Sequence, residues 1–386
     1  MSDSPARVSA VNVGEHPNKG WVVSTFGKRT YLVHNGACVE SPEQQPLQEV
    51  PVAAEDGVDL LAEADLVMHR DLVDIVVRGH AYPHARATSF EAGLAIDQFL
   101  AKFAVFGNRR VEPSGAGLRF TPPEQFDRIP LGWQSAYGGF DAVTHQKQGA
   151  GLDDLMKKAG IVPDPRFGLF SYPRNPLGKG YLCEINPEAV AACALPNLEA
   201  LDALLAPDKL AFGPKRWPAA PPPVSTTWLP YTFFPRSFWL GLPFLPFDDK
   251  QIRPDDFPEV RSGHISKDSA RADGGPPERR FSPLVSQAAP LGLRCRAVGS
   301  SAKIRVKNLH PKFAQWDFKL PGDTPRMYVR WPGQQPTEVR PQIRTLLIEP
   351  DQDRVTLVWV ADLVLPAPFP LAHTGAIEHA VRWRSG

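Results

Sequence analysis

The sequence contains little cysteine, and the cysteines it has are not arranged to bridge segments of the chain. Only four occur among 386 residues, and no two of them form a C-x-x-C pair. Such sparse, scattered thiols are typical of reduced proteins and exclude a disulfide framework as the basis of the fold. We expect free thiols at Cys38, Cys183, Cys193 and Cys295.

Long apolar runs and an excess of charge of one sign are also missing. No stretch approaches the roughly 20 apolar residues of a membrane-spanning helix, and residues 1–20 lack the apolar core of a secretory signal. The formal net charge is +1, which gives no electrostatic case for a nucleic-acid or anionic-membrane partner. We therefore expect a soluble, cytoplasmic protein without either partner.

A phosphate-binding loop is not expected, although one segment is superficially similar to it. The segment RNPLGKGYL, residues 174–182, contains a Gly-Lys-Gly triplet. A phosphate loop needs a helix after it and, in its common form, a Ser or Thr directly after its lysine. Here Tyr181 and Leu182 continue like a strand instead. We predict that this segment binds no nucleotide and that the protein has no cofactor.

No catalytic or metal-binding constellation is recognisable. There is no G-x-S-x-G nucleophile elbow, and Cys183 and Cys193 have no histidine near them in the sequence. His80 and His84 are four residues apart, but Pro83 rules out the helix that would place both on one face. We expect surface or hydrogen-bonded histidines here, no metal site and no enzyme activity.

Proline, in contrast, is abundant, and the regular patterns that remain are those of strands. The 42 prolines are about twice the ordinary share of roughly 5%. Because proline interrupts helices and central strands, the chain must turn often. In residues 98–111, the apolar side chains alternate with period two, which predicts a strand with one buried face. The residues of that face are Phe99, Ala101, Phe103 and Val105.

Further strands are predicted near both ends of the chain. Residues 21–33 are β-branched and aromatic, and the Gly27-Lys28 pair in their middle predicts a hairpin turn. The other predicted strands lie within residues 72–82, 302–309, 326–331, 344–350 and 353–365.

Helix signals are few. The better one covers residues 196–207, where four leucines share a face, Asn197 is placed to cap the helix and Pro207 to end it. A weaker signal covers residues 151–160. Together with the strands, these patterns predict a mainly β fold with few short helices.

The composition divides the chain into three parts. Residues 249–288 are polar and rich in glycine and proline, so we expect a long surface connection there. This connection separates a β-rich, sandwich-like N-terminal body, residues 1–248, from a smaller C-terminal β domain, residues 289–386.

Residues 216–248 combine prolines with many aromatic side chains. One interpretation is an irregular segment that packs its rings into the core. The other is a rigid docking surface, because aromatic residues anchor protein interfaces and a stiff backbone loses little entropy on binding. A mixture, with a few rings exposed, fits the sequence as well. The residues predicted to bind a partner are Trp228, Tyr231, Phe233, Phe234, Phe238 and Trp239.

Several short motifs follow one another in a specific order. They are VFGNRRV (105–111), IPLGWQSAYGGF (129–140), NPLGKGY (175–181), LPNLE (195–199), FGPKRW (212–217), LPFLPFDD (242–249) and VKNLHPKFAQWDFKLPG (306–322). Over residues 20–365, the sequence resembles domain-of-unknown-function family 2169. Members of that family resemble accessory proteins of bacterial type VI secretion.

The resemblance implies a structural role for three of these motifs. The glycines of AYGG and NPLGKG would allow backbone angles or close approaches that side chains forbid. Asn175 and Pro176 would fix the entry into a turn, and Asn197 would begin the predicted helix. The residues assigned to these structural motifs are Tyr137, Gly138, Gly139, Asn175, Pro176, Gly178, Gly180, Asn197 and Glu199.

The resemblance also implies a function. Members of the family are encoded with VgrG or PAAR spike proteins and toxic effectors. The chain is therefore expected to be a non-enzymatic adaptor or chaperone that binds a secreted effector and helps load it onto the spike. One alternative is a β-rich enzyme acting on carbohydrate or cell-wall material, with Asp248, Asp249, Trp228 and Trp239 as residues of suitable type. The other is a structural component of the secretion apparatus.

Overall fold

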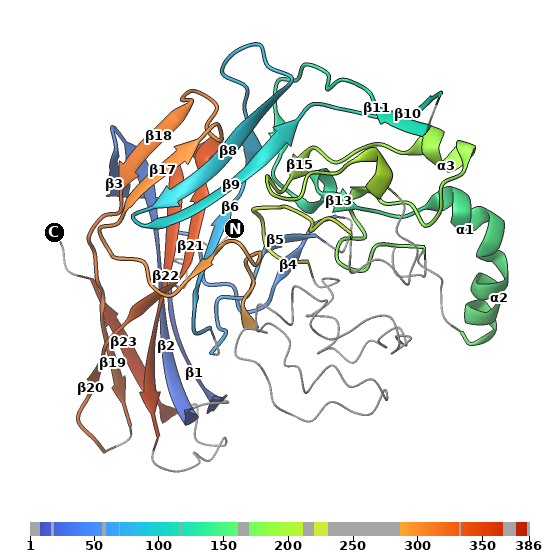
Figure 1. Cartoon of the computed structure of the whole chain (residues 1–386). Coiled ribbons are helices and arrows are strands. Elements are labelled where there is room, and N and C mark those ends of the chain that lie inside the picture. The colour runs from blue at the N-terminus through green and yellow to red at the C-terminus, as the bar shows by residue number, and fades with distance from the viewer. Residues whose placement is uncertain are drawn as a thin grey trace.

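The protein folds around one large, curled β-sheet. Twelve described strands form this sheet, which curls into a half-barrel. Small sheets lie around it, and the helices α1 (Ala142–Gln148), α2 (Ala150–Lys158) and α3 (Pro187–Ala192) lie together at one side (Figure 1). The mainly β class with few short helices is confirmed. The computed structural model describes residues 8–16, 19–55, 59–68, 70–115, 117–160, 170–210, 220–230, 286–331, 333–365 and 376–383.

The large sheet alternates strands from both ends of the chain. Its strands are β1 (Ser9–His16), β2 (Gly20–His34), β3 (Ala37–Glu40), β6 (Val73–Val77), β8 (Ser89–Ile96), β9 (Phe99–Phe106), β15 (Leu198–Glu199), β16 (Arg294–Cys295), β17 (Lys303–Lys307), β18 (Gln315–Lys319), β21 (Gln342–Glu349) and β22 (Arg354–Val364). Their order is β15-β9-β8-β17-β18-β3-β2-β22-β21-β6-β16, with β1 pairing β2 outside this path.

This order joins the two β regions into which the composition divides the chain. β17 pairs with β8, and β22 lies between β2 and β21. Strands that follow residue 289 thus lie between strands that precede residue 248, and both sets share one sheet. Of the predicted connection, residues 249–285 lie outside the described part of the chain.

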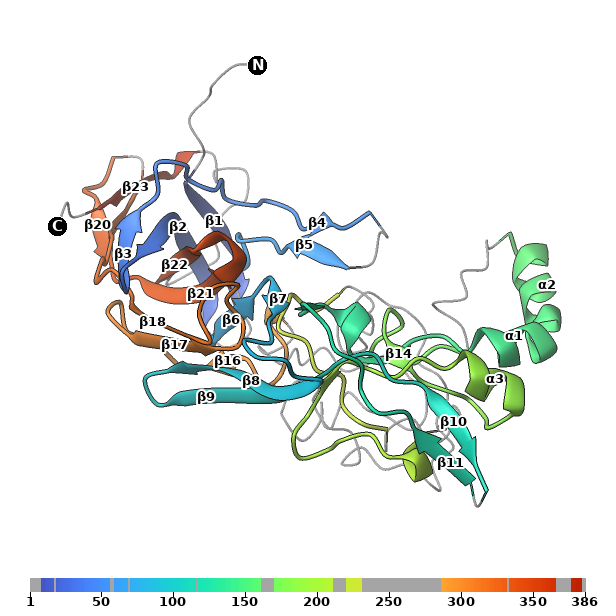
Figure 2. The ribbon, with the colours of Figure 1, turned by 90° about the horizontal axis from the view of Figure 1, so that it is seen from above.

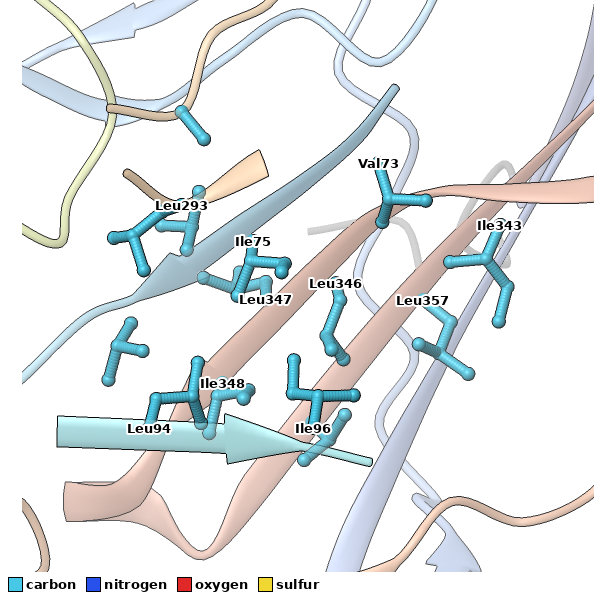
Figure 3. Packing of buried hydrophobic residues seen from close by; sticks show 14 of the residues in the cluster. Val73, Ile75, Leu94, Ile96, Leu293, Ile343, Leu346, Leu347, Ile348 and Leu357 are labelled. Atoms are coloured by element: carbon cyan, nitrogen blue, oxygen red, sulfur yellow. The ribbon is translucent and has the colours of Figure 1, made fainter. Parts of the chain in front are cut away.

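The main core lies against β6, whose five residues are all buried. β6 and β21 run parallel, with Ile75 opposite Leu346. Strands covered on both faces read as continuous apolar runs, and the VDIVV of β6 follows this pattern except at Asp74. Figure 3 shows branched side chains of β6, β8 and β21 gathered in this core, with Leu293, from the segment just before β16, beside Ile75.

The predicted hairpin in residues 21–33 is wrong, because β2 runs through it without a turn. A Cβ on Gly27 would lie 2.9 Å from Cε of Met327, so the glycine accommodates close packing rather than a turn. Lys28 is buried, and its Nζ donates to Oδ2 of Asp65 at 2.8 Å. Within one continuous strand, Gly27 thus allows close packing against Met327, and Lys28 forms a buried ion pair with Asp65.

Between β9 and β16 most of the described chain, apart from β15, lies outside the large sheet (Figure 2) and forms a second, smaller core. Tyr137, Tyr172 and Tyr181 lie at its centre, with ring centroids 5.2 and 5.4 Å apart. The elements here are β10 (Val111–Ser114), β11 (Gly117–Phe120), β12 (Ile129–Pro130), η1 (Trp133–Ser135), β13 (Tyr137–Gly138), α1 (Ala142–Gln148), α2 (Ala150–Lys158), β14 (Lys179–Gly180), α3 (Pro187–Ala192) and η3 (Pro207–Lys209).

The remaining elements lie around the large sheet. β7 (His80–Ala81) pairs with β12, and β4 (Val52–Ala53) pairs with β5 (Leu60–Ala62). A three-stranded sheet holds β19 (Arg326–Arg330), β20 (Thr337–Val339) and β23 (Glu378–Arg382). The short helix η8 (Pro350–Gln352) connects β21 to β22.

Of the two predicted helices, α2 confirms the one over residues 151–160, and the one over residues 196–207 is wrong. Asn197, predicted as a helix cap, donates from Nδ2 to the carbonyl oxygen of Phe106 at 2.9 Å. The chain then forms β15, in which Leu198 pairs with Val105. Pairing with β9 overrides the local helical pattern. No helix in the described ranges combines the length and apolarity needed to cross a membrane.

Glu349 makes the stability of the fold depend on pH. Its buried carboxylate accepts a hydrogen bond from Nε of Arg78 at 2.9 Å and a second from Arg354. Burial alone would raise the pKa of Glu349, but the hydrogen bond from Arg354 and the charge of Arg78 hold it below its usual range. Such a carboxyl stabilises the fold above its unfolded-state pKa, and this contribution is lost as the pH falls through the folded-state pKa.

We therefore expect the urea midpoint to fall on acidification, and to fall less steeply in a Glu349→Gln variant. Tryptophan fluorescence during urea titrations from about pH 7 to about pH 3 measures both slopes. Equal slopes in the two proteins would contradict this assignment. The variant is expected to be less stable near pH 7, because Arg78 and Arg354 lose their charged partner.

Candidate functional site: a groove along the edge of β9

An open, mostly apolar groove lies where β9 meets the smaller core. Its volume is about 470 Å³. Leu100 is 61% exposed and Leu201 is 44% exposed in its walls, although leucine is among the residues most often buried. Exposed apolar side chains that gather at one place are typical of a site that binds another molecule. We call it the β9 groove; it is lined by residues 100–103, 200–202, 222–226 and 290–293 with Trp133, Arg174 and Leu229.

The groove follows the edge of β9 rather than one of its faces. Successive residues of a strand point to opposite faces, so a groove lined by four consecutive residues, 100–103, must run along the edge. Phe103 turns into the main core, whereas Leu100 and Lys102 are exposed. Figure 2 shows β9 at the outer side of the sheet, next to β8.

Glu199 ends β15 after two residues and thereby leaves this edge open. Its carboxylate is buried, pairs with Arg109 and accepts a hydrogen bond from the N–H of Leu205 at 2.8 Å. The second bond draws residue 205 back towards residue 199, so the chain loops away from β9. The loop brings Leu201 to the groove.

The structural motifs predicted from the sequence meet beside the groove. β13 and β14 pair in parallel, with Gly138 opposite Gly180. We call this strand pair the joint. The side chain of Asn175 binds to it, because its Nδ2 donates to the carbonyl oxygens of Trp133 at 2.8 Å and Tyr137 at 3.0 Å. The joint therefore also fixes the position of Trp133, which lines the groove. Tyr137, Asn175, Pro176, Asn197 and Glu199 are all buried here.

Main-chain N–H groups of residues 179 and 181, in and directly after the Gly-Lys-Gly triplet, are used within this joint. The N–H of Lys179 donates to the carbonyl oxygen of Ala136 at 3.0 Å, and that of Tyr181 donates to Gly138 at 2.9 Å. A phosphate cradle needs such groups free to point at the anion. In this segment these N–H groups instead form hydrogen bonds between the parallel strands β13 and β14.

The joint positions the groove wall through Trp133. The indole Nε1 of Trp133 donates to the carbonyl oxygen of Trp228 at 2.6 Å, and its ring packs against Leu229. The N–H of Leu229 donates to the carbonyl oxygen of Ala288 at 2.8 Å. Segments 222–229 and 286–293 are therefore held together, and both line the groove.

The structure places Trp228, one of the predicted partner-binding residues, in the main core. Its side chain is 4% exposed and packs among the buried residues of the large sheet, so its ring is not available to a partner. Two residues earlier, Thr226 exchanges hydrogen bonds with Val77 of β6, and its N–H donates to the carbonyl oxygen of Leu131 at 3.2 Å. The other predicted partner-binding residues, Tyr231, Phe233, Phe234, Phe238 and Trp239, lie outside the described part of the chain, as do Asp248 and Asp249.

Sequence reasoning missed the residues that form the groove. Leu100 falls on the outer phase of the period-two pattern of β9, opposite the phase of Phe99 and Phe103. An apolar residue at an outward position is a signal that could have marked this edge. Leu201 is one of the four leucines of the predicted helix over residues 196–207, which does not form.

The cysteines are free and weakly reactive. All four lack a disulfide partner, which confirms the prediction. Burial raises the pKa of Cys38 and of Cys193 to about 12, and that of Cys183 to about 11. Because the thiolate is the nucleophile, these three side chains are poor nucleophiles near neutral pH.

His80 lies in a small polar cluster on the surface. Its Nδ1 is 2.7 Å from Oδ2 of Asp351, and the hydroxyl of Tyr82 donates to Oδ1 of the same carboxylate at 3.1 Å. His84 is exposed nearby in the sequence. Among the residues that the structure describes, no three His, Cys, Asp or Glu side chains come together as metal ligands do.

A second, much smaller cavity is lined by residues of β2, β21 and β22. Its volume is about 40 Å³, and the charged side chains of Lys28, Asp65 and Arg78 are among those that line it. This space is the size of a few water molecules. The β9 groove is the larger of the two and is therefore the better candidate site.

One sequence comparison relates the chain to a known family. The sequence model of the family described as "Uncharacterized protein conserved in bacteria (DUF2169)" matches residues 18–360. The matched range includes every strand of the large sheet except β1 and the last residues of β22, and it includes the whole β9 groove. No curated protein and no solved structure matches the chain.

Proposed function

We propose that this chain, which belongs to the DUF2169 family, is a non-enzymatic adaptor that binds a secreted effector and helps load it onto a VgrG or PAAR spike. It would act in the cytoplasm, cover an apolar segment of the effector before secretion, and release it when the spike is fired. The β9 groove would be the surface that holds this segment.

The observation that carries the proposal is the exposed apolar wall of the β9 groove. Leu100 of β9 and Leu201 of the loop after β15 remain open to solvent, while other lining residues such as Phe103 and Leu293 are buried. The buried hydrogen bonds of Asn175 and Glu199 hold both sides in place. A preformed apolar groove loses little entropy when it binds, which is what a protein that holds a partner segment requires.

The test is co-expression of the tagged full chain with the VgrG, PAAR and toxin proteins encoded beside it. We expect a stoichiometric complex with at least one of them in affinity purification and size-exclusion chromatography. If none of them co-purifies, the adaptor function is rejected.

Leu201→Asp is expected to weaken this complex by at least about tenfold, because it places a charge in the apolar wall. The matched control is Leu155→Asp, since Leu155 is also exposed but lies in α2, far from β9 (Figure 1). The dissociation constants are measured by biolayer interferometry. If both variants weaken the complex equally, the partner does not dock in the β9 groove.

A further inference from the structure

The first half of β9 lacks a strand neighbour on one side within the described part of the chain. On its inner side, β9 pairs with β8 along its whole length, from Ser89 opposite Phe106 to Ile96 opposite Phe99. On its outer side, β15 pairs only with residues 104 and 105. Residues 99–103 therefore present a strand edge to the β9 groove.

The hydrogen-bond pattern shows which main-chain groups face this edge. The N–H of Phe106 donates to the carbonyl oxygen of Asn197, next to β15, at 2.8 Å. The N–H and C=O of a strand residue point to one side, and this side alternates along the strand. Ala104, Lys102 and Leu100 therefore turn their main-chain groups towards the outer edge. In agreement, the carbonyl oxygen of Ala101 lies against Gly93 of β8.

This edge is not protected in the ways that proteins use to prevent strand addition. Proline, a bulge or a charge pointing along the edge would prevent it. β9 pairs with β8 in a continuous register without a bulge. The one charged residue, Lys102, lies 3.1 Å from Oε1 of Glu91 on β8, so its charge is held back over the sheet. The groove beside the edge is mostly apolar.

The turn after β15 determines the length of the open edge. An antiparallel strand that continued β15 would place residues 200–203 opposite residues 103–100. Instead, the hydrogen bond between Glu199 and the N–H of Leu205 loops this stretch away. Residues 100–103 and residues 200–202 line the same groove, so the looped stretch leaves a space beside the open edge.

We propose that the β9 groove binds an extended segment of the partner protein, which adds a strand to the open edge of β9 and continues the row that β15 begins. The main-chain N–H and C=O of Leu100 and Lys102 bond the backbone of this segment. Every second side chain of the segment is apolar and packs against the leucine-lined wall. This inference rests on the proposed adaptor function and specifies the chemistry of its partner.

The test compares Lys102→Pro with Lys102→Ala in the full chain, using the complex obtained by co-expression. Proline removes the N–H that faces the open edge and leaves the bonds to β8 intact, which edge strands tolerate. We expect Lys102→Pro to weaken the complex by about tenfold or more, and Lys102→Ala to change the affinity by less than about twofold. Thermal unfolding of both variants checks that the fold is kept.

Hydrogen exchange of the unmodified chain gives a second readout that needs no variant. The amides of Leu100 and Lys102 are expected to exchange at least about tenfold more slowly in the complex than in the free chain. If the complex forms but Lys102→Pro binds as tightly as Lys102→Ala, or these amides exchange at an unchanged rate, strand addition is excluded and the adaptor function stands. If no complex forms, both proposals fall together.

Discussion

Replacing Asp74 by alanine is expected to lower the free energy of unfolding by about 3–5 kcal/mol, a large part of the roughly 5–15 kcal/mol that stabilises a typical domain. Asp74 is fully buried in β6. Its carboxylate accepts hydrogen bonds from Nε2 of Gln287 at 2.8 Å and from the N–H groups of Ala288 at 2.9 Å and Ala289 at 3.1 Å, and Arg70 lies 3.4 Å away. Alanine would leave these buried donors without their acceptor.

Urea titration followed by tryptophan fluorescence measures this loss. Asp127→Ala is the matched control, because Asp127 is exposed and its removal is expected to change stability by less than about 0.5 kcal/mol. A loss below about 1 kcal/mol for Asp74→Ala would show that the donors find other partners. The variant should also weaken partner binding, since residues 290–293, directly after Ala289, line the β9 groove.

The strands of this fold could be predicted where burial on one face imposes a local pattern. In β9 the period-two alternation of Phe99, Ala101, Phe103 and Val105 matches the face that packs on the main core, so the prediction is confirmed. The order of the strands could not be predicted. It depends on pairings such as β8 with β17, whose residues are about two hundred positions apart and carry no shared local pattern.

The two wrong local predictions, the hairpin and the helix, have the same cause. Each gives a residue the role that its type usually has in local structure. Gly27 and Lys28 are typical of a turn. Here the missing side chain of Gly27 leaves room for Met327, and Lys28 forms an ion pair with Asp65. Asn197 is typical of a helix cap, but its amide binds the main chain of Phe106. In each case the deciding partner is distant in the sequence, and tertiary contacts override propensity.

The candidate site was predictable only as separate pieces. The sequence motifs with Gly138, Asn175 and Glu199 were identified as structural, and the structure places them around the β9 groove. The groove itself combines four segments that span residues 100–293, and its exposed leucines are recognisable only once the chain is folded. The aromatic segment that suggested a docking surface contributes Trp228 to the core instead.

Gly138→Ala is expected to destabilise the protein by about 3 kcal/mol or more and to weaken partner binding with it. Gly138 has φ of +144°, which side chains rarely adopt, and a Cβ there would lie 2.1 Å from the carbonyl oxygen of Asn175. That oxygen belongs to the main chain and also accepts the N–H of Gly139, so it cannot move aside without breaking the joint between β13 and β14.

Gly151→Ala is the matched control for this prediction, with both variants compared by urea titration and by affinity for the co-purified partner. Gly151 lies in α2, and a Cβ there meets nothing within 4 Å. In a helix, alanine is favoured over glycine by about 0.5–1 kcal/mol, so this variant should unfold at the same or a higher urea concentration. Equal midpoints for both variants would contradict the close packing at Gly138.

A stable Gly138→Ala protein that no longer binds would instead mean that the joint acts on the β9 groove directly, since Asn175 carries the displacement to Trp133 in the groove wall.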